Sequence, residues 1–146
     1  MLHQVLIGSV LMIITTFIHA GGMALGFRWL TIIYTERSDI PSIFTRALVV
    51  GAFVIVMFVT TLVEAGVWAM TYSMLYAVSD FEKALYFSTV TYTTLGYGDV
   101  VLDAQWRLLS SFQAANGIIM FGWTTALIVV VIHRVSMSLR ELGSPR

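Results

Sequence analysis

Residues 93 to 99, Thr-Thr-Leu-Gly-Tyr-Gly-Asp, stand between two long apolar segments. Irregular backbone at membrane depth is tolerated only where it is buried in protein or lines a water-filled path. Gly96 and Gly98 can adopt positive φ without a Cβ clash, so successive carbonyls here can turn toward one axis. A ring of carbonyl oxygens can replace the water shell of a cation. The stretch therefore predicts a cation-coordinating loop, with a plain surface turn as the alternative.

The composition indicates an integral membrane protein. Of the 146 residues, 58% are hydrophobic and 11% are charged, and the mean hydropathy is +0.88. A soluble domain carries about 25% charged residues. The net charge of zero gives no indication of a nucleic-acid partner, and no soluble partner is implied. Cysteine is absent, which excludes disulfides and thiolate metal sites.

Three apolar segments are each long enough for a helical span, which needs about 20 residues. They run from Val5 to Phe27, from Ala47 to Val78, and from Trp106 to Ile132. A cleaved signal peptide is the competing interpretation of the first segment. A signal peptide needs a positively charged start, however, and no Lys or Arg precedes Arg28. We therefore expect three transmembrane helices.

A short helix is expected between the second and third spans. Ser79 to Glu82 reads as a capping box with Ser79 as the N-cap. A helix from Asp80 to about Tyr92 would be roughly 20 Å long, which is too short to cross a bilayer. It fits a re-entrant pore helix whose C-terminal end, with its partial negative charge, points at an ion path. The predicted fold class is thus all-α and integral to the membrane.

The stretch at 93 to 99 resembles the selectivity filter of potassium channels, whose common form is T-V-G-Y-G-D. Leu95 stands where valine is usual. Trp106-Arg107 opens the third span much as in bacterial two-span potassium channels. That family's inner-helix pattern is similar to Gly117, Phe121-Gly122 and Thr125-Ala126 of this sequence. The resemblance covers about Phe44 to Ile132, so the first span is an addition to the two-span pattern.

The resemblance implies a potassium-selective channel of four identical chains, because one loop supplies only a quarter of a ring. It implies that K⁺, the permeant ion, is bound by carbonyls of Thr94, Leu95, Gly96 and Tyr97, with Gly98 completing the filter. The residues expected to support the filter are Asp99, Glu64, Tyr86 and Tyr92. Those expected to line the pore or form the gate are Gly117, Ile118, Phe121, Thr125 and Val129. Conduction makes and breaks no bond, so we expect no enzyme.

The same resemblance divides the chain into four parts. Residues 1–34 would form an extra transmembrane helix, 35–46 a cytoplasmic connection, 47–135 the pore domain and 136–146 a short cytoplasmic tail. Six of the eight Lys and Arg residues lie at positions 28–46 or after Ile132, and the other two, Lys83 and Arg107, lie in the 78–107 region. Because positive charge favours the cytoplasmic side, we expect the N-terminus and the filter opening outside, in a plasma or bacterial inner membrane.

Glu64 and His19 are isolated ionisable residues within apolar spans. An intramembrane carboxylate is a functional candidate by default; we expect Glu64 to brace the filter from behind, bonded to Gln113, Asn116 or a pore-helix hydroxyl. Counted from Arg46, Glu64 would lie about 27 Å along the second span. Counted from Arg28, His19 would lie about 13 Å along the first span. The depths differ, so we do not expect these two residues to pair unless the first helix continues beyond Arg28. His19 is then a core residue, with pH sensing as the alternative.

Two other functions remain open. A channel of the same fold could be a weakly selective cation channel, and a chain of this fold could be a non-conducting partner subunit or membrane scaffold. Ion flux through the purified chain in liposomes separates a channel from a scaffold. The ratio of potassium to sodium permeability separates the two kinds of channel.

Overall fold

The computed structural model describes residues 1–35 and 42–142, with side chains described for 1–32 and 42–133. It contains the helices α1 (Leu2–Thr35), α2 (Ile43–Met74), α3 (Phe81–Tyr92) and α4 (Arg107–Leu142), and these residues contain no strand. Three of the helices are long and apolar enough to cross a membrane. The chain is therefore an all-helical integral membrane protein. Parts of the expected 35–46 connection and 136–146 tail lie outside the described residues.

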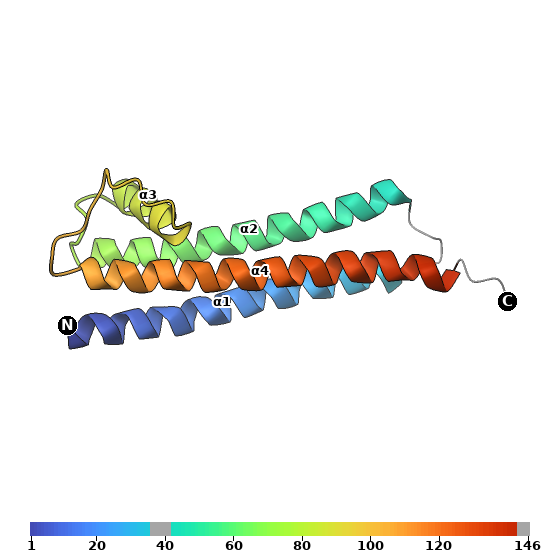
Figure 1. Ribbon diagram of the computed structural model, residues 1–146, viewed down its shortest axis with the longest axis horizontal. Coiled ribbons are helices and arrows are strands. Elements are labelled where there is room, and N and C mark those ends of the chain that lie inside the picture. The colour runs from blue at the N-terminus through green and yellow to red at the C-terminus, as the bar shows by residue number, and fades with distance from the viewer. Residues whose placement is uncertain (36–41, 143–146) are drawn as a thin grey trace.

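The three long helices run side by side, and α3 lies at the end of the bundle where the chain begins (Figure 1). Helix α1 contacts α2 and α4, and α3 contacts the same two helices. Helix α3 runs from its end of the bundle toward the middle, and the loop after it returns to that end before α4 starts (Figure 1). The short helix is therefore re-entrant, as expected. The N-terminus and the loop share one end, and the C-terminal end of α4 lies at the other (Figure 1).

Several helix boundaries differ from those of the expected apolar segments. Helix α2 begins at Ile43 and not at Ala47, and α4 continues past Ile132 to Leu142. Helix α1 continues past the apolar segment that ends at Phe27 and reaches Thr35, close to the end of the 1–34 range expected for the extra helix. Helix α2 ends at Met74 because Tyr76 has a φ of 52°, which a right-handed helix does not allow. The N-cap of α3 is Asp80 and not Ser79: its backbone is extended and its carboxylate accepts a bond from the Lys83 amide at 3.3 Å. The free carboxylate takes the capping role, so the helix begins at Phe81.

Helix α1 packs closely against α2 through two glycines. A Cβ on Gly22 would overlap the Thr60 side chain, and a Cβ on Gly26 would lie 2.8 Å from the Phe53 ring. Small residues one turn apart let two helix backbones approach in a membrane. The first span is thus an integrated part of the bundle.

The core at the α3 end of the bundle contains four aromatic side chains. Trp68 and Tyr72 of α2 and Phe87 and Tyr92 of α3 are all buried. The rings of Tyr72 and Phe87 meet edge to face, with centroids 5.3 Å apart, an arrangement that aromatic pairs favour. This cluster fixes α3 against α2 and so sets the position of the loop that follows.

Candidate ion-coordinating site

The loop after α3 has an alternating backbone. Thr94, Gly96 and Gly98 have φ values of 61°, 56° and 81°, whereas Leu95 and Tyr97 between them do not have positive φ. When φ keeps one sign along an extended chain, successive carbonyls point to opposite sides; alternation of the sign brings them to the same side. Thr94 is β-branched, and holding such a residue in the left-handed region costs about 1–3 kcal/mol. Its surroundings must therefore hold it there.

Backbone hydrogen bonds tie the start of the loop to α3. The amide of Thr94 donates to the Thr91 carbonyl at 3.0 Å. The amides of Leu95 and Gly96 both donate to the Val90 carbonyl, at 3.0 and 3.3 Å. Every peptide bond in the described residues is trans, so each carbonyl points away from the N–H of its own peptide unit. The Thr93, Thr94 and Leu95 carbonyls are thus directed away from α3.

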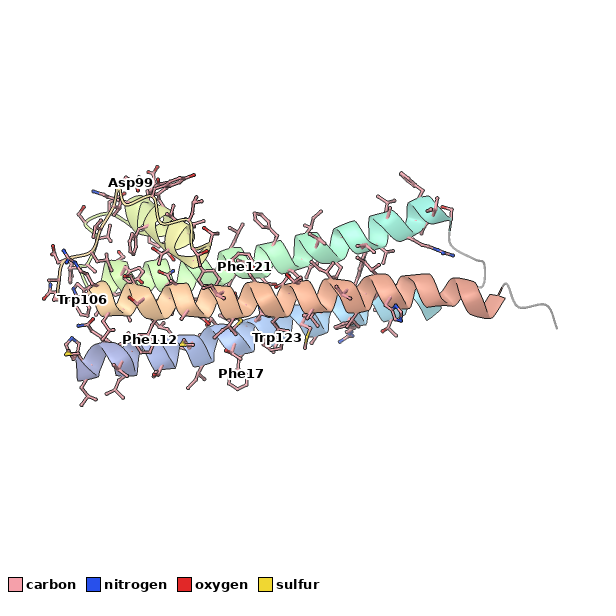
Figure 2. All side chains as sticks on the ribbon, viewed as in Figure 1. Phe17, Asp99, Trp106, Phe112, Phe121 and Trp123 are labelled. Carbon is pink, nitrogen blue, oxygen red and sulfur yellow. The ribbon has the colours of Figure 1, made fainter. Side chains whose placement is uncertain are left out.

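The far end of the loop is tied to α3 by a side chain. The Tyr86 hydroxyl donates to Asp99 Oδ2 at 2.7 Å, and the Val100 amide donates to Asp99 Oδ1 at 3.1 Å. The bond from Tyr86 is the main cause that holds the pKa of Asp99 below its usual range. Asp99 is exposed at the outer edge of α3 (Figure 2). The loop therefore carries negative charge at its outer end, and Tyr86, also exposed, orients it.

A buried polar chain connects the inner end of α3 to the other three helices. Tyr92 donates its hydroxyl to Glu64 Oε2 at 2.6 Å, and His19 Nδ1 lies 2.9 Å from Glu64 Oε1. The other ring nitrogen of His19 lies 3.2 Å from the Thr124 hydroxyl. His19, Glu64 and Tyr92 are fully buried. Glu64 thus bonds to a hydroxyl of the short helix, as expected.

The depth argument against a His19–Glu64 pair carried one exception, a first helix that continues beyond Arg28, and that exception holds. That argument placed the inner end of the first helix near Arg28. Helix α1 instead continues to Thr35, which puts His19 about 24 Å above the end of its helix. Helix α2 in turn begins at Ile43, which puts Glu64 about 32 Å above the start of its helix, so the two heights differ by about 8 Å instead of the expected value of about 14 Å. The sequence signal that could have predicted this pair is that His19 and Glu64 are each an isolated ionisable side chain in an apolar span.

A second buried network joins α2, α3 and α4. Ser88 donates its hydroxyl to the Ala65 carbonyl at 2.6 Å, and Gln113 Nε2 donates to the same hydroxyl at 2.6 Å. Tyr72 donates to Gln113 Oε1 at 2.8 Å. Gln113, expected as a partner of Glu64, therefore holds the middle of α3 instead. Asn116, the other expected partner, donates to Thr15 of α1 at 2.7 Å.

Helix α4 touches the end of α3 at Gly117. A Cβ on Gly117 would overlap the backbone carbonyl oxygen of Tyr92, so only glycine allows this approach. Helix α4 is continuous across Gly117, and hinge bending there stays a prediction. The glycine has a packing role in addition.

Of the five residues expected to line the pore or form the gate, Gly117 is buried, and the other four are exposed on a single chain: Ile118, Phe121, Thr125 and Val129. The Phe121 ring lies 6.4 Å from the Tyr92 ring. Phe121 lies on the side of α4 toward α3, whereas Phe112 and Trp123 point toward α1 (Figure 2). The helices of one chain therefore leave this face of α4 uncovered.

Comparison with known proteins identifies one family. A family model described as "Ion channel" matches residues 47–134. The matched part holds nearly all of α2, all of α3, the loop, and α4 as far as Arg134. Helix α1 lies outside it. Neither a curated protein nor a solved structure matches the chain.

Proposed function

Because the chain belongs to the ion-channel family whose model matches residues 47–134, we propose that it is a potassium-selective channel. The observation that carries the proposal is the loop backbone. Positive φ at Thr94, Gly96 and Gly98 alternates with ordinary φ, and the first amides bond back to α3. Carbonyl oxygens in such a row can replace the hydration shell of a cation. The ion then moves down its gradient without any covalent step.

In this proposal, the carbonyls of Thr94, Leu95, Gly96 and Tyr97 bind K⁺, and Gly98 completes the row. The Thr94 hydroxyl adds a ligand at the innermost site. The C-terminal end of α3 contributes its partial negative charge near that site. Asp99 attracts cations to the outer end.

One loop can cover only one side of an ion, so we propose that four chains surround one axis. The uncovered face of α4 supports this assembly, because Ile118 and Val129 are 62% and 61% exposed on one chain. Large apolar side chains on that face would line the cavity or meet a neighbouring chain.

The orientation proposed from the Lys and Arg count places the loop outside. The bundle supports it, since the N-terminus and the loop lie at one end and the C-terminal end of α4 lies at the other (Figure 1). Three spans put the two termini on opposite sides of the membrane. The C-terminus is then cytoplasmic.

The proposal is tested by ion flux through the purified protein in liposomes, with K⁺ and Na⁺ gradients compared. We expect K⁺ to pass much faster than Na⁺. Equal fluxes would indicate a weakly selective cation channel. An assembled protein without flux would indicate a non-conducting subunit or a scaffold.

Gly96→Ala probes the loop directly. No atom lies within 4 Å of a Cβ at Gly96, so on one chain the substitution acts through its φ of 56°. A side chain in this left-handed region costs roughly 1–2 kcal/mol. We expect the variant to insert into membranes and to lose potassium-selective flux. Gly66→Ala on α2 is the matched control, since its surroundings are equally open and its φ is not positive.

A further inference from the structure

Helix α1 lies outside the matched channel domain, yet it supplies a partner to the buried carboxylate next to the loop. Glu64 and His19 are both 0% exposed and lie 2.9 Å apart. A carboxylate removed from water needs hydrogen-bond donors or a countercharge. The structure gives Glu64 two such partners, Tyr92 and His19. Without α1, only the Tyr92 hydroxyl would remain.

The His19 ring is held so that it can orient the carboxylate. Its second nitrogen lies 3.2 Å from the Thr124 hydroxyl, and its ring lies 5.1 Å from the Trp123 ring. The bond to the Glu64 carboxylate requires that Nδ1 carries a proton, because an ionised carboxylate only accepts. A threonine hydroxyl can donate or accept, so Nε2 is bonded to Thr124 whether or not it also carries a proton. In each case Glu64 Oε2 remains free to accept from Tyr92. Helices α1 and α4 thus fix the direction in which the carboxylate faces α3.

Tyr92 is the last residue of α3, and it is held on two sides. Its hydroxyl bonds to Glu64, and its carbonyl abuts Gly117. Thr94 follows almost at once, with its strained φ of 61°. Strained torsions persist only where their surroundings over-determine them. A shift of Tyr92 would therefore release the first carbonyls of the loop.

We propose that His19 is a positioning residue for ion selectivity, which acts through Glu64 and Tyr92 on the loop at Thr94. Helix α1 is then a built-in accessory helix whose buried imidazole holds the coordinating carbonyls in place. This inference rests on the proposed potassium channel. It adds a dependence of selectivity on a residue outside the channel domain.

The test compares the K⁺/Na⁺ permeability ratio of full-length variants in planar bilayers with their thermal stability in detergent. His19→Leu removes both ring nitrogens, and His19→Asn keeps a donor near the position of Nδ1. We expect His19→Leu to lower the ratio by about tenfold, the effect of losing one hydrogen bond to a buried charged group. His19→Asn should retain most of the ratio. If His19 had only a structural role, His19→Leu would lower the thermal stability and leave the K⁺/Na⁺ permeability ratio unaltered.

Thr15→Val is the matched control on the same helix. Thr15 is also fully buried and hydrogen-bonded, but its partner is Asn116 of α4 and not Glu64. We expect this variant to be less stable and to keep the wild-type ratio. A loss of selectivity in Thr15→Val as large as that in His19→Leu would overturn the specific role of His19.

Tyr92→Phe keeps the test decisive if His19→Leu fails to assemble. It removes only the hydroxyl that Glu64 accepts from, and it should lower the ratio as His19→Leu does. The double variant should lose no more than either single one, because both changes break one chain of contacts. If the wild type is selective and the K⁺/Na⁺ permeability ratio is unchanged in Tyr92→Phe or in His19→Leu, this inference is overturned and the proposed function stands. A wild type without selective flux overturns both.

Discussion

At the scale of single residues, Asp99 shows how one neighbour sets the charge at the outer end of the loop. The hydrogen bond from Tyr86 lowers the pKa of Asp99. A depressed pKa means that this bond contributes stability above the pKa of the unfolded chain, and that the contribution is lost as the pH falls through the folded pKa. Tyr86→Phe should therefore raise the pKa of Asp99 and remove this contribution at neutral pH.

The measurement is an NMR titration of the Asp99 carboxyl carbon, with thermal stability followed over the same pH range. Tyr76→Phe is the control, because Tyr76 lies in the turn after α2 and is 93% exposed. Identical titration of Asp99 in the wild type and in Tyr86→Phe would show that the bond does not set its charge.

At the scale of elements, the docking of α1 depends on close approach to α2. A Cβ on Gly22 would overlap Thr60, whose hydroxyl is engaged with the Val56 carbonyl at 2.9 Å and whose branched side chain is stiff. Overpacking of this kind costs typically 1–3 kcal/mol. It outweighs the gain of about 1 kcal/mol for alanine over glycine in a helix. Gly22→Ala should therefore lower the unfolding temperature.

The adjacent glycine provides the comparison. No atom lies within 4 Å of a Cβ at Gly21, so Gly21→Ala should leave the unfolding temperature unchanged or raise it. Both are measured by the loss of the folded species on size exclusion after heating. Equal shifts in the two variants would mean that α1 does not dock through Gly22.

At the scale of the whole molecule, the proposed tetramer places one face of α4 along the pore. The chain has no cysteine, so single cysteines report their own surroundings. Cysteine at Thr125 or Val129 should react with thiol reagents from the cytoplasmic side and reduce the current. Cysteine at Leu127 should not, because Leu127 is buried against the other helices of its own chain. Equal reaction all around α4 would contradict the assignment.

Much of the fold could be predicted from the sequence, because the features concerned are local. The number of spans follows from the length of apolar segments against the thickness of a bilayer. The re-entrant helix follows from a helical segment that is too short to cross the bilayer and that lies between two segments long enough to do so. The need for glycine at Gly96 and Gly98 follows from the φ values that other residues avoid. Each of these depends on a segment by itself and not on how the segments pack.

The tertiary structure alone decided which buried polar groups meet. His19 pairs with Glu64 because of how α1 packs against α2, and Gln113 bonds to Ser88 because of how α4 is rotated against α3. Each residue by which an expected helix end is misplaced shifts the estimated height of a side chain by about 1.5 Å. An error of a few residues in a boundary therefore exchanges one partner for another. The sequence determined that buried polar groups need partners, and the packing of the helices selected them.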